Sequence, residues 1–196
     1  MLFVAAILCG CASSPRWTRQ TFAFELPSDP PATMSNTNLV ALHRLSISPL
    51  FQSRAFTYRT ADNAYEQDPY AGFLIPPEQA LAETIRASMR ASGVFGKVVP
   101  PGSALAPSLV AEVSVTQLYG DFRQRSQPVG TLEIHFICYE VTDRVPGRIV
   151  LDKVCAHETR MAARTPAALM AAWDSDLGEI MEEINSAYNK ASSTTH

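Results

Sequence analysis

The chain has 196 residues, 46% of them hydrophobic, which is enough for one domain with a hydrophobic core of its own. A net charge of −3 and the lack of any run of Lys and Arg argue against nucleic acid as a partner, because phosphate binding needs a basic surface. Beyond the first ten residues, no stretch approaches the ~20 apolar residues that span a bilayer.

The N-terminus begins with an apolar run at residues 2–8, which is too short for a transmembrane helix and is typical of a signal peptide. The run leads into Leu8-Cys9-Gly10-Cys11, which resembles a bacterial lipobox. The resemblance implies that residues 1–10 are removed together with Cys9, and that Cys11 becomes the first residue and carries the acyl chains of a membrane anchor. An ordinary secretory leader and a buried N-terminal strand are the alternatives.

Residues 11–20 form a small, polar stretch after the leader, which predicts a lipidated, flexible tether. Ala12 stands where an Asp would resemble a retention signal for the inner membrane, so we expect an outer-membrane location facing the periplasm. No Lys or Arg precedes Arg16, although signal peptides begin with positive charge. A start of the chain further upstream would account for this missing charge.

Hydrophobic periodicity predicts a single α/β domain over residues 21–190 and a disordered tail over residues 191–196. Strands are expected at residues 21–26, 39–47, 55–59, 94–99, 109–122, 131–141 and 149–161. One helix is expected over residues 77–92, between a Pro pair and Gly93, and a second from Thr165-Pro166 onward. Residues 63–74 are expected to be irregular. This order predicts a mixed, largely antiparallel sheet with two main helices packed against it.

The second helix has an apolar stripe and an acidic face. The stripe comprises Leu169, Trp173, Leu177, Ile180, Ile184 and Tyr188, and we expect it to face the core. The acidic residues are Asp174, Asp176, Glu179, Glu182 and Glu183, which we expect to be solvated because their spacing does not suit a metal.

Motifs for catalysis are absent from the sequence, which has no G-x-S-x-G, no H-E-x-x-H and no C-x-x-C. His43, His135 and His157 are scattered, so we expect ordinary surface or hydrogen-bonded histidines. We therefore predict no catalytic residues, no metal and no cofactor.

A turn at Pro146-Gly147 is predicted between the last two strands, because these residues suit the centre of a type II turn. This register places Cys138 opposite Cys155, on the side of the hairpin that faces the core. A cross-strand disulfide and two buried free thiols are both compatible with it. The same register creates three favourable charge pairs across the strands: Glu140 with Lys153, Glu133 with Arg160, and His135 with Glu158.

Residues 47–95 carry a more specific pattern, and residues 118–122 (LYGDF) extend it. Its matching positions are Tyr58-Arg59, Tyr65, Asp68, Tyr70, Phe73-Leu74, Pro76-Pro77 and Gly93-Val94-Phe95. With the lipobox, this pattern resembles the ABC-type transport auxiliary lipoproteins, the family of the Pqi-type lipoproteins of intermembrane transport. Pro69 and the two late cysteines depart from the family pattern.

The resemblance implies an α/β fold and a non-catalytic outer-membrane lipoprotein. Such a protein works beside an ABC permease, its ATPase and an MCE-domain substrate-binding protein, which together move lipids or hydrophobic solutes between membranes. A ring of identical subunits is one expected arrangement. The candidate contacts with the MCE assembly are aromatic, with core packing as the alternative for each: Phe56, Tyr58, Tyr65, Tyr70 and Phe73.

A second function is open at this point, in which the protein is itself a lipid carrier that holds an acyl chain in a cavity between sheet and helix. An esterase is a distant third. Neither alternative has a sequence motif in its favour.

Overall fold

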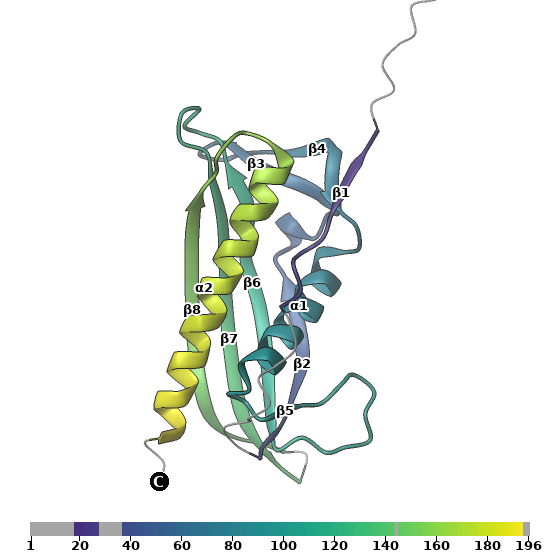
Figure 1. Ribbon diagram of the computed structural model, residues 1–196, viewed down its shortest axis with the longest axis vertical. Helices are drawn as coiled ribbons and strands as arrows, with labels where there is room; N and C mark the ends of the chain where they lie inside the picture. Colours follow the sequence, from purple (N-terminus) through teal and green to yellow (C-terminus); the bar gives the residue numbers. More distant parts are fainter. Residues whose placement is uncertain (1–17, 28–36, 144, 194–196) are drawn as a thin grey trace, which may run out of the picture.

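The computed structural model describes residues 18–27, 37–143 and 145–193, which form one eight-stranded mixed sheet and two long helices (Figure 1). The strands are β1 (Gln20–Phe22), β2 (Leu39–Ile47), β3 (Ala55–Ala61), β4 (Ala64–Phe73), β5 (Lys97–Val98), β6 (Leu109–Asp121), β7 (Val129–Thr142) and β8 (Val145–Arg160). The helices are α1 (Pro77–Ser92), α2 (Pro166–Ser193) and the short 3₁₀ helix η1 (Pro49–Phe51). The predicted fold class is confirmed.

Strand β6 is the centre of the sheet. Along one edge it pairs with β7 in an antiparallel ladder, and β8 pairs in turn with β7. Its other edge is shared by two parallel strands, β2 along the first half and β3 at the last two residues. Helix η1 lies between β2 and β3 in sequence, where the chain leaves the edge of β6 before rejoining it. Strands β4 and β1 continue the sheet beyond β3, and β5 pairs with β2.

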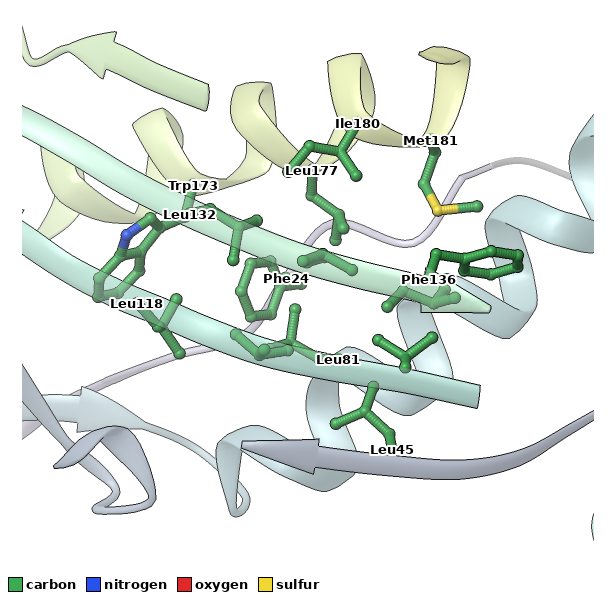
Figure 2. Packing of buried hydrophobic residues seen from close by; sticks show 14 of the residues in the cluster. Phe24, Leu45, Leu81, Leu118, Leu132, Phe136, Trp173, Leu177, Ile180 and Met181 are labelled. Carbon is green, nitrogen blue, oxygen red and sulfur yellow. The ribbon is translucent and has the colours of Figure 1, made fainter. Parts of the chain in front are cut away.

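Both long helices cover the same face of the sheet, and the core lies between (Figure 1). Strand alternation supplies one side of this core, with Leu132, Ile134 and Phe136 of β7 all at most 1% exposed. The predicted apolar stripe of α2 supplies the other side, and every one of its residues is buried. Figure 2 shows Leu118 and Leu132 of the sheet among Trp173, Leu177 and Phe24.

Trp173 lies at the centre of an aromatic cluster that joins distant parts of the chain. Its ring packs edge-on against Phe56 at 5.0 Å and stacks on Phe73 at 5.5 Å. Phe22 and Phe24, in the N-terminal segment, pack against Phe56 and Phe73 in turn. The indole N–H of Trp173 donates to the carbonyl of Thr131 (3.2 Å), so its one polar atom is paired.

Gly130 allows the first turns of α2 to approach the sheet closely. A Cβ at this position would lie 2.7 Å from the Cβ of Ala172, closer than two carbons can pack. Gly120, opposite Gly130 on β6, has the side chain of Leu169 3.1 Å from its own virtual Cβ. Two paired glycines therefore form the shallow seat on which α2 rests.

Strand β4 replaces the irregular stretch predicted over residues 63–74, although Pro69 and Gly72 disfavour strands. The strand tolerates Pro69 since residues 68–71 bulge away from β3: Gln67 pairs with Thr57, and the next pair is Gly72 with Ala55. Within the bulge, one carboxylate oxygen of Asp68 accepts the backbone N–H groups of Tyr70 and Ala71, at 2.8 and 3.0 Å. The side chain of Asp68 thus replaces the missing ladder partners.

The predicted hairpin register is wrong, by four residues between Val129 and Cys138 and by six at the pair of Thr142 with Val145. The predicted turn at Pro146-Gly147 is wrong as well, because Thr142 already pairs with Val145, and Asp143 before that pair's second member has a positive φ of 52°. Asp tolerates this left-handed conformation, and Pro146 is accommodated because β8 is an edge strand. The three predicted charge pairs do not form. His135 instead contacts Asp152 at 2.6 Å, and Arg148 contacts Glu140 at 2.6 Å.

Of the two alternatives for Cys138 and Cys155, the structure has the two buried free thiols and not the cross-strand disulfide. Cys138 lies opposite Leu151, and Cys155 lies opposite Ile134. An offset of four residues corresponds to roughly 13 Å along a strand, whereas bridged cysteines have Cα atoms less than ~7 Å apart. Because the register error is even, both thiols still face the core, as expected, at 0% and 2% exposed.

The ends of the domain differ from prediction. The strand expected over residues 21–26 is only β1, because the chain leaves the sheet after Phe22 and buries Phe24 in the core. At the other end α2 continues to Ser193, into the predicted disordered tail. Cys11 and most of the predicted tether lie outside the described residues.

Two glycine variants test the seat of α2. Gly130→Ala should lower the free energy of unfolding by about 1–3 kcal/mol, because the new methyl overlaps Ala172. Gly178→Ala should raise it by about 0.5–1 kcal/mol, because Gly178 is an exposed α2 residue with no atom within 4 Å of a Cβ. Urea denaturation monitored by circular dichroism measures both, and equal effects of the two variants would contradict the close packing.

Thiol labelling tests the register. Burial raises the pKa of Cys138 to about 12 and that of Cys155 to about 11, and only thiolates react with iodoacetamide. The native chain at pH 8 should therefore leave both unlabelled, while the denatured, unreduced chain should take one group at each. Peptide mass spectrometry reads the two sites separately. A peptide pair linked through Cys138 and Cys155 would disprove the register.

Candidate functional site

An aromatic patch lies on the face of the sheet that the helices leave uncovered. It consists of Leu50 and Phe51 of η1, Tyr65 of β4 and Tyr119 of β6. Tyr119 points to this outer face because Leu118 and Gly120 on either side face the core and α2. The patch therefore forms where η1 and β4 meet the last part of β6.

The three rings of the patch are in mutual contact. Phe51 lies 5.6 Å from Tyr119 and 6.1 Å from Tyr65, and Tyr65 meets Tyr119 edge-on at 5.8 Å. Phe51 and Tyr119 are buried at 4% and 5% exposed, whereas Tyr65 is 40% exposed and Leu50 is 63% exposed. The patch thus presents Tyr65 and Leu50 to solvent on a rigid aromatic base.

A chain of hydrogen bonds continues from this base across the outer face. The hydroxyl of Tyr119 donates to Oε1 of Gln117 (2.9 Å), whose Nε2 donates to Glu133 (3.0 Å). Thr116 also donates to Glu133. Because both ends of Gln117 are engaged, the ring of Tyr119 has a defined orientation beneath Tyr65.

The five predicted contact residues separate into exposed and buried groups. Tyr65 and Tyr70 are exposed, at 40% and 49%. Tyr58 is half-buried: it stacks on Phe122 at 4.6 Å and donates to Asp68 at 2.7 Å, and its burial together with that carboxylate raises its pKa. Phe56 and Phe73 follow the alternative of core packing, because they belong to the core cluster around Trp173.

The sequence does not indicate that Leu50, Phe51 and Tyr119 come together at the patch. Tyr119 was placed within a strand, but its face depends on the bulge between Val115 and Gln117, which reverses the alternation. Leu50 and Phe51 follow Pro49, two residues after the strand predicted over residues 39–47, and lie outside every predicted element. An apolar pair directly after a strand-ending Pro is the signal that could have indicated them.

A second polar site lies between β8 and α2. His157 contacts Glu179 through Nδ1 (2.8 Å) and Glu183 through Nε2 (2.7 Å), and both nitrogens can donate only when the imidazole is protonated. Lys153 adds a contact to Glu183 at 3.2 Å, and the hydrogen bonds from His157 and Lys153 lower the pKa of that carboxyl. Part of the acidic face of α2, predicted to be solvated, therefore pairs with the sheet.

Asp176 also departs from the predicted solvated face. It is 0% exposed, and neither carboxylate oxygen makes a normal hydrogen bond with another described residue. Burial raises its pKa to about 6, although nearby Thr159 and His157 act in the opposite direction. Trp173 and Leu177 on the same helix are buried in the core, so the position of α2 keeps the carboxyl of Asp176 buried as well.

Within the described ranges, no three His, Cys, Asp or Glu side chains are arranged to hold a metal ion. None of the helices in the same ranges has the length and apolarity to cross a membrane. An open groove of about 570 Å³ runs between the N-terminal segment and α2, lined by Phe22, Met170 and others. Glu25 and Asp174 also line it, joined by a hydrogen bond from the backbone N–H of Glu25 (3.0 Å).

Solved structures share this architecture. Protein XCC0632 from Xanthomonas campestris, described as family-model DUF330, superimposes with a TM-score of 0.73 at 17% identity, over 90% of this chain and 98% of its own. An uncharacterized protein gives 0.61 at 14% identity, over 85% and 99%. Lipoprotein GNA1162 from Neisseria meningitidis gives only 0.32 at 13% identity, over 75% and 99%, which is too low to infer a shared fold.

No protein-family model and no curated protein matches this chain. The two stronger structural matches are too distant in sequence to carry over a function, and they show the fold alone. The fold is thus one that occurs in a DUF330 protein, and the function must be argued from the residues of this chain.

Asp176→Asn tests the buried carboxyl. Because its pKa is higher folded than unfolded, the wild type loses stability as the pH rises from about 4 to above 6, where the carboxyl must ionise in the core. The variant has no ionisable group at this position. It should therefore be as stable as the wild type or less stable at pH 4, and more stable than the wild type by about 1–3 kcal/mol at pH 8. Urea denaturation at both pH values measures this, and a stability difference independent of pH would contradict it.

Proposed function

We propose that this chain is a non-catalytic outer-membrane lipoprotein of an ABC and MCE intermembrane transport system, and that the aromatic patch docks the MCE-domain protein. The observation that carries the docking role is Tyr65, which is 40% exposed although it rests on Phe51 and Tyr119. Lipids or other hydrophobic solutes would be the cargo.

The geometry of the patch suits an interface anchor. Tyr is enriched among the residues that dominate binding energy, and a ring already held by its neighbours loses little side-chain entropy on binding. Leu50 adds exposed apolar surface next to Phe51, and the Gln117–Glu133 network adds a polar border. This combination of an apolar centre and a polar rim is typical of protein interfaces.

The membrane part of the proposal depends on the sequence. The lipobox at Leu8–Cys11 supports a lipid anchor, and the pattern around Tyr58-Arg59 and Pro76-Pro77 supports the transport family. The described domain begins at Thr18, seven residues after Cys11, so a short tether would hold it near the membrane surface. The shared fold with a DUF330 protein is compatible with this proposal.

Binding to the MCE-domain protein of the same transport system tests the patch. Tyr65→Ala should weaken the affinity at least about tenfold, because it removes the proposed anchor while leaving the buried core in place. Val154→Ala is the matched control, since Val154 is an apolar residue of β8 that is 59% exposed and lies away from the patch. Biolayer interferometry with the full chain in detergent measures both.

Equal affinity of the Tyr65→Ala variant and the wild type would refute docking through this patch. Native mass spectrometry of the purified chain tests the carrier function. One phospholipid retained per chain would favour the carrier, and an empty chain that binds the MCE-domain protein would favour docking.

A further inference from the structure

Three arginines line one pocket at the end of the molecule where α2 begins. The pocket has a volume of about 420 Å³ and lies between the β6–β7 loop and the β8–α2 loop. Arg125 comes from the first loop, Arg164 from the second, and Arg160 is the last residue of β8. The remaining lining residues are Ser126, Pro128, Met161, Ala162 and Ala163. No carboxylate belongs to the lining, so the charge of the three guanidinium groups is not neutralised within the pocket.

The two loops are joined firmly enough to define the pocket. The backbone N–H of Met161 donates to the carbonyl of Pro128 (2.9 Å), and Nη2 of Arg160 donates to the carbonyl of Ser126 (3.4 Å). Arg164 packs its guanidinium over the ring of Phe122, 4.5 Å from the centroid. Each of these contacts is to a neutral group, so the positive charges remain available for an anion.

The neighbouring Arg123 shows the contrast. It lies in the same loop but is paired with two carboxylates, Asp62 at 2.8 Å and Asp121 at 2.7 Å. Arg125, two residues further on, has no such partner among the described residues and lines the arginine pocket. Within this loop, Arg123 thus stabilises the fold through its ion pairs, whereas Arg125 is available to a ligand.

We infer that the arginine pocket binds the phosphate group of an anionic phospholipid headgroup. Guanidinium groups recognise phosphate through paired N–H donors, and three of them around an open cavity match a phosphodiester. The first turn of α2 follows Arg164 directly, and the partial positive charge of a helix N-terminus adds to the potential there.

The position of the pocket favours a membrane lipid over free phosphate. Phe22 of β1 and Ala167 at the start of α2 line a common groove, so the N-terminal segment lies close to the end of α2 that follows Arg164 in sequence (Figure 1). The seven residues from Cys11 to Thr18 can span at most about 25 Å. This choice of source rests on the proposed anchor at Cys11, which would keep the pocket close to headgroups.

Isothermal titration of the full chain in neutral detergent tests the inference with three soluble probes. Glycerophosphoglycerol, the headgroup of phosphatidylglycerol, should bind one per chain. Inorganic phosphate should bind to the same pocket, and glycerophosphocholine should bind more weakly because its choline cation faces the arginines. Arg125→Gln and Arg164→Gln should each weaken glycerophosphoglycerol binding about fivefold or more.

Arg19→Gln is the matched control, because Arg19 is exposed near the same end, carries the same charge and does not line the pocket. Equal weakening by Arg19→Gln would show diffuse attraction and overturn the pocket. Binding of inorganic phosphate without glycerophosphoglycerol would overturn the headgroup assignment, and binding of none of the probes would overturn the site. Thermal unfolding should change little in all three variants, since these arginines are exposed. Docking depends on Tyr65, so the two proposals fail separately.

Discussion

The packing of Trp173 against Phe56 and Phe73 is the contact on which the rest of the structure depends. It brings together α2, β3 and β4, and through Phe22 and Phe24 it adds the N-terminal segment. The ring can reach this position only because α2 lies close to the sheet over Gly130. A large aromatic ring with its N–H paired to Thr131 therefore sets the distance between helix and sheet at this end of the molecule.

The shared edge of β6 explains why an aromatic surface forms on the opposite face. Strand β2 covers the edge only as far as Val115, and β3 joins it at Gly120. The chain between them folds as η1 and places Phe51 over Tyr119, while β4 brings Tyr65 to the same point. The side chains of Phe51 and Tyr65 thus cover the break between β2 and β3 along this edge, and Tyr65, the outermost of them, is exposed to solvent.

The charged side chains of the molecule differ in whether they contact a group of opposite charge. At the seam between β8 and α2, His157 and Lys153 contact Glu179 and Glu183, so the acidic face of the helix contributes to packing against the sheet. At the end where α2 begins, Arg123 is neutralised, whereas the arginine pocket has no carboxylate in its lining. The first arrangement stabilises the fold, and the second is suited to an anion from outside.

The sequence by itself determined the elements whose cause is local. Strand β2 and helix α1 have the predicted bounds, and the core stripe of α2 was identified from its periodicity, because burial on one face leaves a repeating pattern along the chain. The inward direction of Cys138 and Cys155 was also predicted, since an even register error preserves the face. Only the tertiary structure decided which residues pair across the strands and whether an aromatic ring faces Trp173 or solvent. It also decided the bulge that lets β4 pair with β3 despite Pro69. Phe56 and Tyr65 have similar local contexts, and only the strands and helix that surround each ring distinguish core from surface. Such contacts join residues far apart in the chain, so no short stretch of sequence contains them.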